Sequence, residues 1–243
     1  MKIDIPIFII ARGYNKEIEN RTLFVLPYVY YYINKLELVN RCFVISTSNK
    51  ILSLAKKLGF TKMYKINSDD VDYNFIEFYG PALCTYDNKL DYNWAIVMPV
   101  VACYYDNDLI YNTINKINYN YDVITSYNVI PDISQYLLND DFSFVHNNQI
   151  KNIASYHNWN DIYVIDNAIY CINKDFAEKC VNSTNPRETF WNGKHLFIRN
   201  NATFTPVITG NNIYKLKENA KLYNSIQQML KDKHIDIQKM VNN

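Results

Sequence analysis

Short, continuous apolar runs separate longer mixed segments along this chain. The first run, residues 7–10, ends at a small residue, a cation and a glycine. An apolar run of four to eight residues bounded by turn residues is typical of a buried strand. By the same criterion we expect further strands at residues 41–47, 60–66, 94–99, 121–127 and 161–172.

The segments between these runs predict helices, because apolar residues recur there at helical spacing. We expect a turn at Pro27 and then helices at residues 28–37, 49–58, 73–83, 109–117, 174–181 and 213–232. The helix at 49–58 should end at Gly59, in the position after a helix where glycine is preferred. We expect residues 182–193 to be irregular and the chain to close with a charged tail.

This alternation of strands and helices indicates a parallel sheet with right-handed crossovers. The predicted fold class is therefore α/β, a Rossmann-like three-layer α/β/α architecture with a mainly parallel sheet, in one domain over residues 1–243. Two β-prone runs surround the turn residues 139–141, which predicts a β-hairpin as an insertion at 132–150.

The amino-acid composition argues against two classes of binding partner, nucleic acids and membranes. The formal net charge is +1 over 243 residues, so no bulk electrostatic field draws the protein to nucleic acid or to a membrane. No stretch reaches the roughly 18 apolar residues that a membrane span needs. The five cysteines are widely spaced, so we expect reduced, buried thiols. The chain opens directly into a strand without a signal peptide, and we expect a cytoplasmic protein.

Three cations follow the first strand closely. Arg12, Lys16 and Arg21 lie within eleven residues of its end, next to the first glycine, Gly13. Ligands of open α/β sheets bind beyond the carboxyl ends of the strands. Cations and the free N–H groups of a turn suit a polyphosphate there. The alternative is a loop whose charges are merely solvated.

The segment 11–21, A-R-G-Y-N-K-E-I-E-N-R, resembles the opening motif of the acylneuraminate cytidylyltransferases, which reads roughly A-R-G-G-S-K-G-I-x-x-K-N. That family transfers CMP from CTP to the anomeric hydroxyl of a nine-carbon sugar acid and releases pyrophosphate. The resemblance implies that Arg12, Lys16 and Arg21 are catalytic and hold the triphosphate, although Arg21 stands where the family has lysine. It implies nucleotide binding by Ala11, Gly13, Asn20 and Pro99.

Later segments resemble the family less closely. Residues 98–104 fall where the family has L-Q-P-T-S-P-L-R, and Tyr104 replaces its arginine. Ala168, Ile169 and Tyr170 match the end of the family's N-G-A-I-Y strand. By position, the resemblance implies that the substrate is bound by Tyr104, Asp166 and Asn167.

The resemblance also implies a cofactor and a quaternary structure. The family binds Mg²⁺ through aspartates that align with residues 206–213, where this chain has no aspartate; we therefore expect Mg²⁺ but assign it no metal ligand. The family's hairpin clasps a second subunit, which implies a homodimer.

Three functions fit these observations. The first is a cytidylyltransferase that uses CTP and a nonulosonic or related sugar acid. The second is a relative that binds a nucleotide or sugar without turnover, favoured by the missing metal carboxylates. The third is a sugar-nucleotide-dependent glycosyltransferase, favoured by two Asp-x-Asp pairs at 70–72 and 106–108. Both pairs precede expected helices, and we interpret them as helix caps.

Overall fold

One seven-stranded sheet forms the centre of the molecule. The computed structural model describes residues 5–67, 76–118, 120–130, 162–202 and 210–242. In this part of the chain the strand order is β3-β2-β1-β4-β6-β5-β7. The strands are β1 (Ile7–Ile10), β2 (Cys42–Ser46), β3 (Lys62–Lys65), β4 (Trp94–Pro99), β5 (Val123–Ile130), β6 (Ile162–Asn173) and β7 (His195–Arg199).

The sheet is mainly parallel, as predicted. β1 pairs in parallel with both β2 and β4, β2 with β3, and β5 with β7. Only β6 runs against its neighbours, β4 and β5. The carboxyl ends of β1, β2 and β4 consequently meet at one edge of the sheet, where Ile10 pairs with both Ile45 and Pro99.

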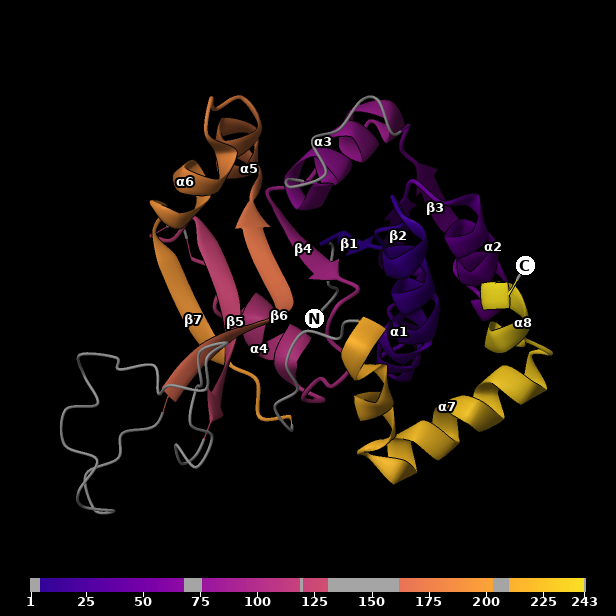
Figure 1. The fold of residues 1–243 in the computed structure, drawn as a ribbon. Helices are drawn as coiled ribbons and strands as arrows, with labels where there is room; N and C mark the ends of the chain where they lie inside the picture. Colours follow the sequence, from indigo (N-terminus) through magenta and orange to yellow (C-terminus); the bar gives the residue numbers. More distant parts are fainter. Residues whose placement is uncertain (1–4, 68–75, 119, 131–161, 203–209, 243) are drawn as a thin grey trace, which may run out of the picture.

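Helices cover both faces of the sheet, which gives three layers (Figure 1). Side chains alternate along β1, so that Ile7 and Ile9 face one core while Phe8 and Ile10 face the other. The first core is covered by α1 (Lys16–Lys35), α2 (Asn49–Leu58), α4 (Leu109–Asn115), η4 (Gly210–Lys217), α7 (Ala220–Asp232) and α8 (Ile237–Asn242). The second is covered by α3 (Ile76–Asn88), α5 (Lys174–Val181) and α6 (Pro186–Trp191).

The prediction of a turn at Pro27 was wrong. α1 begins at Lys16 and continues through Pro27 to Lys35. A proline inside a helix costs about 3 kcal/mol. Residues on both sides of it are fully buried, among them Leu23, Leu26 and Val29, and each such side chain contributes about 1.5–3 kcal/mol on burial. Packing on the sheet therefore outweighs the local cost of the proline.

Two further segments differ from the prediction. Residues 186–191 form α6 instead of an irregular stretch, because Asn185 caps the helix and Pro186 occupies its first turn. The expected helix at 213–232 is divided into η4 and α7 at Asn219, whose side chain accepts a hydrogen bond from Leu222 N at 3.0 Å. The tail also forms α8, with Ile237 buried.

The remaining helices agree well with the sequence pattern. α2 and α5 have the predicted bounds, and Gly59 ends α2 with φ of 117°. α3 continues to Asn88, five residues beyond its expected end. The predicted hairpin at 132–150 and the acidic pair at 70–72 lie outside the described residues, so the hairpin and the single-domain assignment stay predictions.

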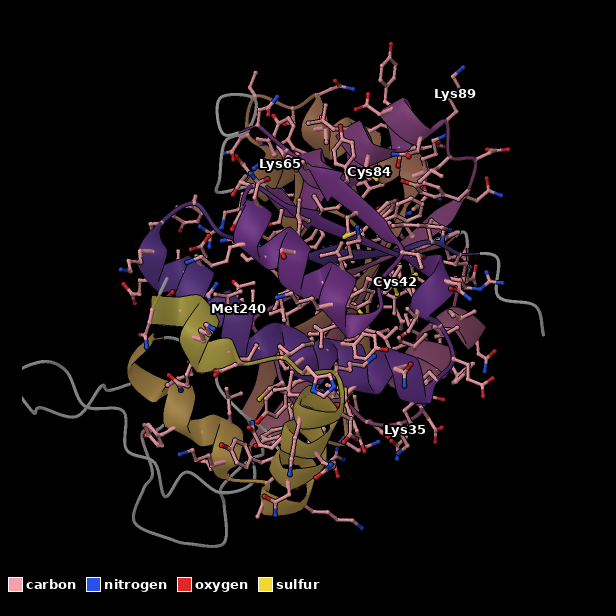
Figure 2. The ribbon with its side chains drawn as sticks, turned by 90° about the vertical axis from the view of Figure 1, so that its right-hand side faces the viewer. Lys35, Cys42, Lys65, Cys84, Lys89 and Met240 are labelled. Carbon is pink, nitrogen blue, oxygen red and sulfur yellow. The ribbon has the colours of Figure 1, made fainter. Side chains whose placement is uncertain are left out.

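Two lysines lie toward opposite ends of the parallel strands. Lys65 ends β3 at the carboxyl edge, and Lys35 ends α1, which runs back from that edge. Figure 2 shows Lys65 and Lys35 toward opposite sides of the molecule.

Within the part of the chain that the structure describes, none of the helices combines the length and the apolar character needed to cross a bilayer.

Candidate functional site

The segment that leaves β1, residues 11–15, turns at the carboxyl edge of the sheet; we call it the elbow. Ala11 is fully buried and donates its N–H to the Ile45 carbonyl at 2.9 Å. On the other side, Val100 N donates to the Ile10 carbonyl at 2.9 Å, directly after Pro99. These bonds fix the start of the elbow between the ends of β2 and β4, where ligands of such sheets bind.

Gly13 allows the elbow to lie against the N-terminus of α2. A Cβ atom at Gly13 would come 2.6 Å from Ser48 Cβ and 2.8 Å from Ile51 Cδ1. Ser48 is itself the cap of α2, and its Oγ accepts a hydrogen bond from Ile51 N at 3.2 Å. Glycine is therefore required at this position because the elbow and the start of α2 approach each other closely. This approach places the free N–H groups at the start of α2 beside the elbow.

Two of the three predicted cations come close together. Arg12 lies in the elbow and Arg21 in α1, and both are half-buried. Burial lowers the pKa of Arg21, and the nearby charge of Arg12 lowers it further; Tyr14 and Glu17 act in the opposite direction. The two guanidinium groups thus repel each other, and an anion between them would relieve that repulsion. Lys16 is exposed at the first position of α1.

Several buried polar atoms at this edge have no hydrogen-bond partner in the described structure. They are Asn20 Oδ1, Arg21 Nε and Thr47 Oγ1. Each such atom costs about 1–3 kcal/mol when it is left without a partner. Native proteins keep few of them, and a group of them at one place calls for an explanation such as a ligand. Thr47 directly follows β2, and sequence reasoning did not select it.

Polar contacts join the helices around the elbow. Ser48 Oγ donates to the carboxylate of Glu19, and Lys50 Nζ lies 3.5 Å from the same carboxylate. Lys65 Nζ donates to Asn49 Oδ1 at 2.7 Å. Lys50 and Lys65 extend the positive charge of the elbow along the ends of β2 and β3. Neither lysine was selected from the sequence, because the sheet order brings them to this edge.

Tyr104 is placed to hold the C-terminal part of the chain. Its side chain is 5 % exposed. The hydroxyl donates to the Lys215 carbonyl at 3.0 Å and accepts from Asn219 N at 3.1 Å. Tyr104 therefore fixes the junction between η4 and α7. Substrate binding by Tyr104 stays a prediction.

Asp166 is the centre of a buried polar network. Its Oδ1 accepts from Ser126 Oγ at 2.5 Å and from Ala168 N at 3.0 Å, and its Oδ2 accepts from Asn200 Nδ2 at 2.7 Å. These bonds connect β6, β5 and the end of β7. Asn167 lies beside it in β6, but its side chain is outside the described residues. Substrate binding by both residues stays a prediction.

Asp106 joins this network instead of capping α4 with its side chain. Asn200 Oδ1 accepts from Asp106 N at 2.9 Å, and the Asp106 carboxylate accepts from Asn201 Nδ2 at 2.9 Å. Asp108 holds the cap position of α4 but makes no side-chain capping bond. Asp106 Oδ1 accepts a hydrogen bond from Asp108 N at 3.3 Å, at the residue that precedes the helix. The expected side-chain cap of α4 is therefore replaced by this turn contact, while the other carboxylate oxygen binds Asn201.

A metal ion needs several acidic, histidine or cysteine ligands in one place. Among the described residues, no three His, Cys, Asp or Glu side chains form a group that could hold a metal ion. Residues 206–209, part of the segment that aligns with the aspartates of the resembling family, lie outside the described structure. Mg²⁺ binding therefore stays an expectation.

Comparison with known proteins supports the fold. No protein-family model matches the chain, and a search of curated proteins gives no match either. A solved structure of CMP:2-keto-3-deoxy-manno-octonic acid synthetase complexed with CTP has 11% identity and a TM-score of 0.61, over 92% of this chain and 98% of that one.

Two structures of another enzyme are similar as well. A 4-diphosphocytidyl-2C-methyl-D-erythritol synthase has 11% identity and a TM-score of 0.62, over 88% of this chain and 97% of that one. The synthase of this kind from Anaerococcus prevotii DSM 20548 has 13% identity and a TM-score of 0.55, over 89% and 98%. The chain thus has the three-layer α/β fold of these solved structures.

Proposed function

We propose that the protein is a CTP-dependent cytidylyltransferase that transfers CMP to a sugar acid and releases pyrophosphate. The observation that carries the proposal is the pair of half-buried guanidinium groups, Arg12 and Arg21, beside buried polar atoms without partners. They lie at the edge of the sheet where this fold binds ligands. The similar solved structures support the choice of nucleotide, because two of their names specify a cytidyl product and one names bound CTP.

The reaction requires positioning and charge more than covalent chemistry by the protein. The hydroxyl oxygen of the acceptor attacks the α-phosphorus of CTP in line and gives up its proton to solvent. The bond from that phosphorus to the β-phosphate oxygen breaks, and pyrophosphate leaves with the electron pair. Arg12, Lys16 and Arg21 would neutralise the charge that develops on the leaving phosphates.

Mg²⁺ is expected from the resemblance. Among the described residues, no three His, Cys, Asp or Glu side chains form a group that could hold it. Glu19 contacts Ser48 and Lys50, and Asp166 accepts hydrogen bonds from Ser126, Ala168 and Asn200. We therefore assign no step to the metal.

The acceptor that we propose is a nonulosonic acid or a related sugar acid. This choice rests on the resemblance of segments 11–21 and 168–170 to the acylneuraminate cytidylyltransferases. By their positions in that resemblance, Tyr104, Asp166 and Asn167 would bind the sugar. The same resemblance supports a homodimer through the 132–150 hairpin, and the mass of the protein in solution would test it.

Thermal unfolding with and without CTP tests the nucleotide site. At a CTP concentration 100 times its Kd, binding stabilises the protein by about 2.7 kcal/mol, which raises the Tm by about 5–10 °C for a chain of this size. Arg12→Ala should abolish the increase. Arg187→Ala, an exposed cation on α6, is the control that should keep it.

Turnover needs a separate measurement. Pyrophosphate release should be followed with CTP, Mg²⁺ or Mn²⁺ and a panel of sugar acids. Release with one of them supports the proposal. CTP protection without release for any acceptor would indicate a binding protein, and protection by UDP-sugars but not by CTP would indicate a glycosyltransferase.

A further inference from the structure

A cavity of about 580 Å³ lies between α1 and the C-terminal elements η4, α7 and α8. Small-molecule pockets of proteins usually measure about 300–1,000 Å³. Figure 1 shows these C-terminal elements, in yellow, beside α1. The walls are apolar and include Phe24, Tyr28, Leu216, Tyr223, Ile226 and Leu230. We call this cavity the C-terminal groove.

The apolar walls are firmly positioned. Ile226 is fully buried, and Leu230 is 5 % exposed. Tyr28 donates its hydroxyl hydrogen to the Leu216 carbonyl at 2.9 Å, so its only polar group is satisfied and its ring can serve as an apolar wall. Such a groove suits a hydrocarbon chain better than a polar ligand.

The lining of the groove also includes charged side chains. Lys217, Lys231 and Asp236 line the groove and are exposed, with a net charge of +1. Asp236 is partly engaged, since its Oδ1 accepts from Lys239 N at 2.9 Å. Lys217 Nζ lies 5.9 Å from the centre of the Tyr223 ring, beside the apolar wall. Lys217 precedes α7 and Lys231 lies in its last turn, roughly 20 Å away along the helix. An anion at the end of the groove beside Tyr223 would therefore be bound by Lys217.

We propose that the C-terminal groove binds a single-chain anionic amphiphile, with the hydrocarbon chain inside and the carboxylate at Lys217. A second cavity, of about 720 Å³ between α3 and α5, differs from the groove because two lysines and two acidic residues on its lining balance each other. The proposal is independent of nucleotidyl transfer.

Calorimetry with ligands below their micelle concentrations tests the chain and the charge. Each buried methylene contributes about 0.8 kcal/mol, so decanoate should bind about tenfold more tightly than octanoate. Decyltrimethylammonium has the same chain and the opposite charge, and it should bind more weakly than decanoate. Equal affinity for the anion and the cation would overturn the proposal.

Two tryptophan variants locate the site. Gln227 lines the groove and Gln228 does not, although both are exposed on α7. Gln227→Trp should obstruct the groove and lower the affinity for decanoate about tenfold or more, whereas Gln228→Trp should leave it unchanged. Equal affinities in the two variants would show that decanoate binds elsewhere, which contradicts the proposal.

Charge removal tests the position of the headgroup. The variant Lys217→Gln should weaken decanoate binding about threefold, as expected for one exposed ion pair. Lys221→Gln removes a lysine of α7 that does not line the groove and is the control. Unchanged affinity in Lys217→Gln would overturn the proposal. So would binding to anionic phospholipid vesicles without binding of monomeric decanoate, because it would identify a membrane surface instead.

Discussion

Arg21 is in an unfavourable position for a charged side chain. Its guanidinium group is partly removed from water, its Nε has no hydrogen-bond partner among the described residues, and Arg12 repels it. A buried charge without compensation lowers the stability of the fold. Groups with perturbed pKa values cluster at functional sites, so Arg21 is a better candidate for a binding residue than exposed Lys16.

Replacement of Arg21 separates stability from binding. We expect Arg21→Met to raise the Tm in the absence of nucleotide by about 2–4 °C, which corresponds to about 1 kcal/mol in a chain of this size. The apolar side chain retains the packing and removes the desolvated charge. The same variant should lose the stabilisation by CTP, measured in the same thermal scans.

The control for this experiment is Arg187→Met. Arg187 is exposed on α6, on the opposite face of the sheet, so neither Tm nor the CTP effect should change. A destabilised Arg21→Met protein that kept the full CTP effect would show that Arg21 is a structural residue.

Sequence reasoning at this scale found the local cations but not their neighbours. Arg12, Lys16 and Arg21 could be predicted from the sequence because they follow one strand closely. Thr47, Lys50 and Lys65 join the same edge only through the order of the strands, which the sequence pattern does not define. The internal bonds of Tyr104 and Asp166 were missed for the same reason, since their partners are far away in the sequence.

At the scale of the element, the start of α1 determines the geometry of the elbow. Asn15 caps the helix, and its side chain accepts a hydrogen bond from Ile18 N at 2.9 Å. The cap lies between Arg12 and Lys16 in the sequence. A change at this position can therefore alter either the order of the helix start or the charge of the elbow.

Two substitutions of Asn15 should separate these effects. Asn15→Ala removes the cap, which should cost about 1 kcal/mol and lower the Tm by about 2–4 °C. Asn15→Asp keeps a capping oxygen and the stability, but it adds a negative charge near the phosphates. We expect its affinity for CTP to fall about fivefold, which calorimetry would measure. Normal CTP affinity in Asn15→Asp would argue against phosphate binding at the elbow.

Helices whose start and end are both indicated by the local sequence were predicted well. α2 has an apolar face, a capping serine and Gly59 at its end, and its bounds were correct. α1 was predicted too short because Pro27 is a strong local signal that tertiary packing overrides. α6 was missed although Asn185, Pro186 and Glu188 form the usual pattern of a helix start.

At the scale of the whole molecule, two separate cores share one sheet. All five cysteines are buried and free, divided between the cores: Cys42, Cys103 and Cys171 lie on the α1 face, and Cys84 and Cys180 on the α3 face. Figure 2 labels one of each group, Cys42 and Cys84. The structure confirms the expectation that the thiols are buried. This burial makes the stability of the molecule depend on pH.

Burial raises the pKa of Cys84 to about 12 and that of Cys180 to about 11, from an ordinary value near 9. Below pH 9 the thiols are protonated in both the folded and the unfolded chain, so their contribution to stability is complete. Above pH 9 only the unfolded chain loses these protons, which favours unfolding. The free energy of unfolding should therefore fall between pH 9 and 11, by up to about 1.4 kcal/mol per thiol and pH unit.

Urea unfolding between pH 7 and 11 measures this decrease. Tyrosines such as Tyr28 and Tyr32, whose pKa values burial also raises, should add to it toward the upper end of the range. The double variant Cys84→Ala, Cys180→Ala removes the contribution of these two thiols, so it should reduce the slope between pH 9 and 10 relative to the unmodified protein. Cys42 and Cys171, whose pKa values burial also raises, should keep the remaining slope. The same thiols should be unreactive toward a disulfide reagent at pH 8 until the protein unfolds. Fast reaction in the folded protein, or a free energy of unfolding constant to pH 11, would contradict the burial that the structure assigns to them.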